Sequence, residues 1–133
     1  MIDNEILKIA SNTENHGILD NPTHFSKLKN SICGDEMKIY LIVENDKIEH
    51  FKYQCRSCIY CQAAVSLLSR KAKNISVEKV KNFLQKANNF FKIKKNNFDK
   101  DWKEFDKIMV KKHIARKECL LLPLKTTLKA LNN

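Results

Sequence analysis

The clearest pattern of hydrophobic and polar positions lies between residues 36 and 54. In EMKIYLIVE, apolar residues recur at every second position, which is the period of a strand with one buried face. Asn45 and Asp46 then supply a two-residue turn, and KIEHFKYQ continues as a second alternating stretch. The pattern predicts an antiparallel hairpin, and FSKLK, residues 25–29, is a short candidate strand before it.

Helical spacing of apolar residues dominates the remainder of the chain. We expect helices over residues 2–10, 62–73, 76–91, 103–114 and 119–131. Ser76 is a candidate N-cap, and Pro123 predicts a kink or an N-terminal turn in the last helix. The turn-rich residues 12–22 and the polar residues 92–102 are expected to be loops.

These elements predict an α+β fold, with a small antiparallel sheet of about three strands in the N-terminal half and helices from the C-terminal half packed on it. The 133 residues suit one domain, 1–133, with neither internal repeats nor an interdomain linker. No stretch approaches the roughly 20 apolar residues of a membrane span, so we expect no membrane partner.

Charge is distributed unevenly along the chain. The net charge is +10, but residues 70–117 hold 16 Lys and Arg against 5 Asp and Glu, which leaves −1 for the other residues. A basic half is typical of proteins that bind nucleic acid or an acidic protein, and also of a solvated lysine-rich surface. Since no nucleic-acid-binding motif accompanies the charge, we expect no nucleic-acid partner.

The five cysteines suggest thiolate chemistry in a reducing compartment. The N-terminus, MIDNEILKIASNTEN, has acids where a secretory signal has bases, so no such signal is expected. The cysteine number is odd, and three of the five fall within seven residues, a spacing that does not suit a disulfide framework. We therefore expect a cytoplasmic protein.

Those three crowded residues, Cys55, Cys58 and Cys61, follow one another at three-residue intervals. A ferredoxin run, C-x2-C-x2-C-x3-C-P, would need cysteine and proline where this chain has Val65 and Ser66. A zinc ribbon would need a second C-x2-C pair, which the sequence lacks. The trio is therefore not a complete metal site.

The predicted elements place other candidate ligands near one member of the trio. Cys33 precedes the first long strand and Cys58 follows the second, so the hairpin brings both to the same end of the sheet. Asp35 lies two residues after Cys33, and Cys119 opens or precedes the last helix. Three thiolates and a carboxylate suit Zn²⁺ or an iron–sulfur cluster. Each residue also has a structural reading, the cysteines as small hydrophobic side chains and the aspartate as a turn residue.

Three stretches of the chain resemble the IscU/SufU/NifU N-terminal-domain family of iron–sulfur cluster assembly proteins. SICGDEMKIYLIVENDKIEHFKYQCRSCIYCQAAVSLL resembles, without a gap, the CGD strand, the hairpin and the F-x-G-x-G-C-x-I-S-x-A-S stretch of that family. TENHGILDN resembles its N-P-R-N-x-G segment and keeps Asn15 and Gly17, and RKECLLLPLKTTLKAL resembles its third-cysteine helix. The resemblance covers nearly the whole chain and implies the fold of that family.

The register of the resemblance separates Cys58 from its neighbours. It aligns Cys58 with the second cysteine of the family, whereas Cys55 and Ser57 replace two glycines and Cys61 replaces a serine. Cys55 and Cys61 are therefore candidates for auxiliary thiols. Within the family, the chain is most similar to the SufU branch, because 61 positions separate Cys58 from Cys119 and NNFFKIKKNNFDKDW resembles the insertion of that branch.

The resemblance implies a metal site made of Cys33, Asp35, Cys58 and Cys119, with Cys119 as the sulfur acceptor. A SufS-like cysteine desulfurase would supply sulfur, and a transient cluster, with [2Fe–2S] as a candidate, would pass to acceptor apo-proteins or downstream carriers. Two other hypotheses use the same residues: a zinc-dependent sulfurtransferase that relays persulfide without holding a cluster, and a structural zinc module that binds a partner through its basic helices. The sequence does not separate a scaffold from an enzyme.

Overall fold

Three antiparallel strands and the helices around them make up the part of the chain that the structure, a computed structural model, describes: residues 3–93 and 98–132. The strands are β1 (His24–Lys29), β2 (Glu36–Glu44) and β3 (Lys47–Arg56). The α-helices are α1 (Asn4–Ala10), α2 (Ile59–Lys71), α3 (Val77–Asn88), α4 (Phe90–Ile93) and α5 (Lys117–Leu131). Two 3₁₀ segments, η1 (Lys100–Lys107) and η2 (Lys111–Arg116), precede α5.

The predicted hairpin is confirmed, with its predicted turn. The sheet order is β1-β2-β3, and both pairs are antiparallel. Asn45 and Asp46 have φ values of 52° and 62°, so both lie in the left-handed region that a two-residue hairpin turn requires. The register pairs Met37 with Cys55 and Glu36 with Arg56, which sets the end of the sheet where the predicted site residues begin.

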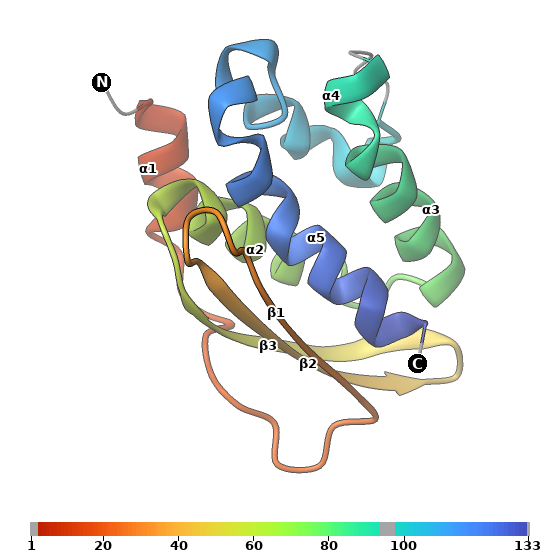
Figure 1. Cartoon of the computed structure of the whole chain (residues 1–133). Coiled ribbons are helices and arrows are strands. Elements are labelled where there is room, and N and C mark those ends of the chain that lie inside the picture. The colour runs from red at the N-terminus through yellow and green to blue at the C-terminus, as the bar shows by residue number, and fades with distance from the viewer. Residues whose placement is uncertain (1–2, 94–97, 133) are drawn as a thin grey trace.

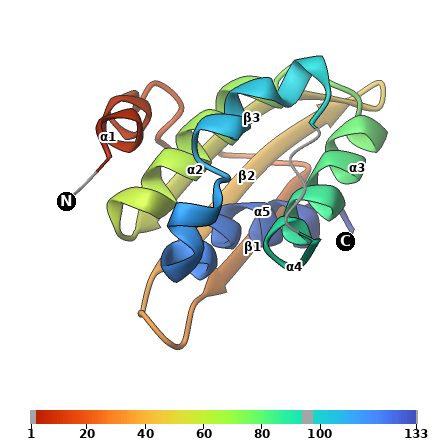
Figure 2. The ribbon, with the colours of Figure 1, turned by 90° about the horizontal axis from the view of Figure 1, so that it is seen from above.

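The helices cover one face of the sheet and leave the other face without helices (Figure 1). Met37, Ile39 and Leu41 of β2 point to the covered side and are completely buried. The helix α5 packs on β1 and β2, α2 packs on β3 and on α5, and α1 and α3 flank this central pair (Figure 2). The predicted α+β class, with helices packed on an N-terminal antiparallel sheet, is confirmed.

The prediction of an α-helix over residues 103–114 is wrong. Two 3₁₀ segments, η1 and η2, occupy this part of the chain instead. Phe83 of α3 stacks on Trp102 with ring centroids 4.2 Å apart and contacts Phe105 at 4.7 Å, which fixes η1 against α3. Val110 is extended, with φ −132° and ψ 154°, and separates the two segments. The helical spacing of apolar residues correctly identified buried side chains here, but tertiary packing determined the backbone conformation.

The other helix boundaries differ only locally from expectation. The second predicted helix begins earlier, at Ile59, and the third divides into α3 and α4. Pro123 lies inside α5, so the predicted N-terminal turn is not formed there. Ile2 of the first predicted helix and residues 94–97 of the predicted loop 92–102 lie outside the described residues. No helix in the described part of the chain has the length and apolar character that crossing a membrane requires.

Ser76 caps α3 as predicted, and its side-chain oxygen accepts a hydrogen bond of 3.2 Å from the backbone N–H of Lys79. We expect Ser76→Ala to lower the free energy of unfolding by about 1 kcal/mol, because one N–H of the first turn loses its partner. Chemical denaturation measures this loss. Ser31→Ala, in the exposed turn before β2, is the control, and an equal loss in both variants would contradict the capping role.

Candidate metal centre

A tight reversal between β1 and β2 presents the first two candidate ligands. The Asn30 backbone N–H donates to the carbonyl of Asp35 at 2.8 Å, and the Gly34 N–H donates to the carbonyl of Asn30 at 2.8 Å. Gly34 has φ +78°, a conformation that glycine adopts without a steric penalty. The reversal leaves Cys33 exposed and places Asp35 in a buried position.

Asn30 is the residue of this reversal that sequence reasoning missed. Its side-chain oxygen accepts a hydrogen bond of 2.9 Å from the backbone N–H of Ile32, which is an Asx turn. The signal in the sequence was an asparagine four residues before a glycine, at the end of a strand. Asn30 therefore supports the loop that carries Cys33, although it offers no ligand itself.

The first turn of α5 completes a group of three donor atoms. The Sγ atoms of Cys33 and Cys119 and a carboxylate oxygen of Asp35 all lie within 4.8 Å of one another. Cys119 is the third residue of α5 and is only 5% exposed. A tetrahedral site with metal–sulfur bonds near 2.3 Å has ligand atoms about 3.8 Å apart. Small side-chain movements would therefore suffice for these three atoms to bind one metal ion.

Cys58 adjoins this group without being a member of it. It is the N-cap residue of α2, with extended backbone angles of φ −72° and ψ 168°. Its backbone N–H donates to Oδ2 of Asp35 at 3.4 Å, and its thiol lies near enough to Cys119 to raise the pKa of that thiol. The structure thus brings Cys33, Asp35 and Cys119 together and places Cys58 beside two of them.

The electrostatics of the group favour a bound cation. Burial, the nearby Cys58 thiol, and the charges of Cys58, Asp35 and Cys33 raise the pKa of Cys119 well above its usual range. The Cys119 thiol therefore keeps its proton at neutral pH in the absence of a cation. A metal ion would reverse this preference, because it stabilises the thiolate directly.

The two remaining cysteines lie next to the group. Cys55 is on β3 opposite Met37 and is partly buried, and burial raises its pKa. Cys61 is completely buried in the first turn of α2, and burial raises its pKa strongly. Neither thiol belongs to the group of three donor atoms.

The replacement of two family glycines by Cys55 and Ser57 costs no backbone strain. Neither residue is among those with positive φ. The chain between β3 and α2 therefore takes a path that ordinary residues adopt, and the two side chains occupy space beside Cys61.

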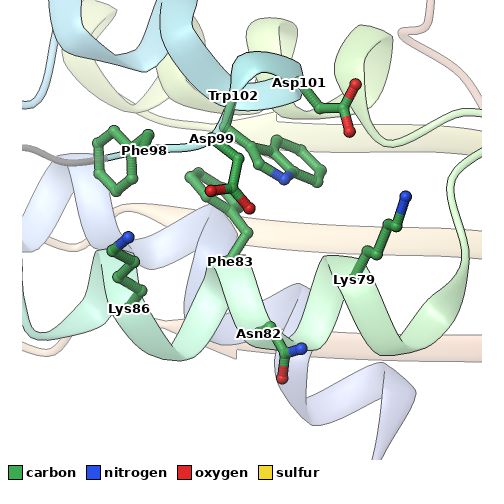
Figure 3. A pocket seen from close by; sticks show the side chains of 8 residues that line it. All are labelled: Lys79, Asn82, Phe83, Lys86, Phe98, Asp99, Asp101 and Trp102. Atoms are coloured by element: carbon green, nitrogen blue, oxygen red, sulfur yellow. The ribbon is translucent and has the colours of Figure 1, made fainter.

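A separate pocket lies between α3 and η1 (Figure 3). Its volume is about 280 Å³, and Phe83, Phe98 and Trp102 form its aromatic part. Lys79 and the aspartates of η1 and its N-cap bring charge of both signs to the rim. None of the predicted site residues lines this pocket.

Comparisons with known proteins agree with the fold. The curated relative "Iron-sulfur cluster assembly scaffold protein IscU" of Thermotoga maritima is 30% identical over 133 residues, covering 98% of this chain and 92% of that protein. A crystal structure titled as a putative iron–sulfur cluster assembly scaffold protein for the SUF system, from Fervidobacterium islandicum, is 25% identical, with a TM-score of 0.86 and coverage of 98% and 96%.

The fold is also similar to that of a NifU-like protein (N-terminal) from Brucella abortus, which is 20% identical with a TM-score of 0.85 and coverage of 98% and 91%. The family described as the NifU-like N-terminal domain matches residues 1–99. These findings confirm the predicted family: the chain belongs to the NifU-like N-terminal domain family, together with IscU and SufU proteins.

Proposed function

We propose that this protein accepts sulfur from a cysteine desulfurase and supports assembly of an iron–sulfur cluster on Cys33, Asp35, Cys58 and Cys119. The observation that carries the proposal is the group formed by Cys33, Asp35 and Cys119, with the Cys58 backbone N–H hydrogen-bonded to Asp35. Family membership adds support, because a curated relative is named a cluster assembly scaffold. Iron and sulfide are then cargo, and apo-proteins or downstream cluster carriers receive the product.

The four residues divide the work according to their chemistry. Cys119 is the sulfur acceptor, and it becomes nucleophilic when a cation displaces its proton. Asp35 contributes a harder oxygen ligand than a thiolate, which keeps iron–ligand bonds exchangeable. Cys33 is exposed and stands where a partner protein reaches the site. Zn²⁺ would fit the same donors and would hold the thiols deprotonated when bound.

Anaerobic reconstitution with ferrous iron, cysteine and a purified cysteine desulfurase tests the proposal. Cluster assembly predicts a coloured protein with acid-labile sulfide. Colourless protein that retains zinc and passes persulfide onward would instead establish the sulfurtransferase, and zinc with no persulfide would establish the structural module.

The ligand set predicts which cysteine substitutions remove metal. We expect Cys58→Ala and Cys119→Ala each to weaken Zn²⁺ binding by at least about 100-fold, since losing a ligand costs more than losing an outer-shell partner. Cys55→Ala should retain most of the affinity, because Cys55 is outside the group. Competition with a chromogenic chelator measures the dissociation constants. Equal losses in all three variants would contradict the proposed ligand set.

Metal affinity should increase with pH. Because the pKa of Cys119 is raised, the thiol is protonated below its pKa, and a metal ion must release that proton to bind. Each released proton makes affinity increase about tenfold per pH unit. Titration with Co²⁺ at pH 6.5 and 7.5, followed through thiolate charge-transfer absorbance, measures this dependence. An affinity that is the same at both values would show that binding releases no proton.

The basic segment 70–117 is a candidate docking surface for an acidic desulfurase. Lys111 is exposed close to the start of α5, whereas Lys112 is paired with Asp3 at 2.7 Å. We expect Lys111→Glu to slow sulfur transfer at low salt without removing metal, and the difference to shrink as salt shortens the Debye length below about 10 Å. Lys8→Glu, an exposed change outside the segment, is the control. A wild-type rate for Lys111→Glu at low salt would exclude docking through this lysine.

A further inference from the structure

Cys58 and Cys61 lie three residues apart at the start of a helix. Cys58 is the N-cap of α2, and Cys61 is the third helical residue. The Gln62 backbone N–H donates to the carbonyl of Cys58 at 3.0 Å, which closes the first turn around the pair. The N-cap and third positions are those that a capping box links through their side chains. In this chain, a thiol stands at each.

The two thiols differ in exposure in the way that a redox-active dithiol requires. Cys58 is partly exposed and lies near enough to Cys119 to raise the pKa of that thiol, whereas Cys61 is completely buried. A strand followed by Cys-x-x-Cys at a helix N-terminus is the arrangement of dithiol oxidoreductases. Cys61 is not one of the proposed metal ligands, so metal binding does not account for this cysteine.

We propose that Cys58 and Cys61 form a redox-active dithiol that releases the accepted sulfur as sulfide beside Cys33, Asp35 and Cys119. This inference rests on the proposed sulfur-acceptor function and adds the source of electrons. Sulfur in a persulfide is at the sulfane level, and cluster formation needs sulfide, so two electrons must be supplied to each sulfur atom. Two thiols that lie one helical turn apart can supply both electrons when they form a disulfide.

The chemistry balances in two thiol exchange steps. The Cys58 thiolate attacks the outer sulfur of the Cys119 persulfide, so the S–S bond at Cys119 breaks and the sulfur moves to Cys58. The Cys61 thiolate then attacks Sγ of Cys58, and hydrosulfide leaves with the two electrons of the broken S–S bond. The proton lost by Cys61 accompanies the hydrosulfide as H₂S. The protein ends with a Cys58–Cys61 disulfide, which an external dithiol reductant restores through the partly exposed Cys58.

Cys55 is three residues before Cys58, as Cys61 is three residues after it, but Cys55 lies on β3, outside the first turn of α2. Cys55 is therefore the matched control for Cys61.

A single-turnover assay with protein that carries one equivalent of Zn²⁺, which deprotonates Cys119, tests the proposal. The sulfur donor is a cysteine desulfurase that has been loaded with persulfide and freed of cysteine and reductant. Wild-type protein should release one sulfide for each sulfur transferred, and peptide mass mapping should then find a Cys58–Cys61 disulfide. Cys61→Ala should keep its persulfide and release sulfide at least about tenfold more slowly. Cys55→Ala should release sulfide as wild type does.

The possible results separate this proposal from the function on which it rests. The dithiol proposal is overturned if persulfide stays on the wild-type protein, or if Cys61→Ala releases sulfide at the wild-type rate. Either result leaves the sulfur-acceptor function intact. Absence of persulfide and sulfide from both proteins overturns sulfur acceptance, and the sulfide-releasing role with it.

A second measurement needs no variant. Wild-type protein treated with an excess of the strong thiol oxidant diamide should form the Cys58–Cys61 disulfide, and a disulfide joining any other pair, or none, overturns the proposal.

Discussion

The antiparallel pairing of β2 with β3 is the constraint on which the rest of this structure depends. Because Glu36 pairs with Arg56, the residues just before β2 and just after β3 lie at one end of the sheet. Asp35 therefore reaches the backbone N–H of Cys58 at 3.4 Å. A slip of one residue would turn the side chains of a whole strand to the opposite face, and the site would lose one of its two sides.

At this end of the sheet, burial and negative charge make the site more stable with a bound cation. Cys119 and Asp35 are both buried, and each additional negative charge makes the next thiol harder to deprotonate. A cation that arrives there removes the repulsion and exchanges for protons, which couples metal loading to thiol reactivity. A site with this electrostatic balance suits transient cargo better than a permanently bound ion, since the protein retains a neutral form between loads.

The same thiol can take part in both stages of the proposed chemistry. Cys58 has Cys119 on one side and Cys61 on the other, so it connects the site of sulfur acceptance to a buried reducing partner. Cys61 and Ser57 stand where the family resemblance has a serine and a glycine, and φ at Ser57 is not positive. Neither position therefore requires the left-handed backbone that favours glycine, so a thiol and a hydroxyl fit there without strain.

The sequence by itself determined the features that arise from short-range rules. Alternation along residues 36–54, the turn at Asn45 and Asp46 and the cap at Ser76 were predictable, because strand period, turn residues and capping act over a few neighbours. The same rules placed Cys33 and Cys58 at one end of the sheet, whereas they left Cys119 as a candidate ligand at the start of the last helix, which the family resemblance then joined to the other two.

Tertiary structure decided the rest. Contacts between α5 and the first two strands bring Cys119 to Asp35, and aromatic packing on Phe83 holds η1 where spacing predicted part of an α-helix. Burial of Cys61 likewise depends on the elements packed around α2. Such contacts join residues far apart along the chain, and no local pattern records which of many apolar surfaces will meet, because the hydrophobic effect that joins them is non-directional.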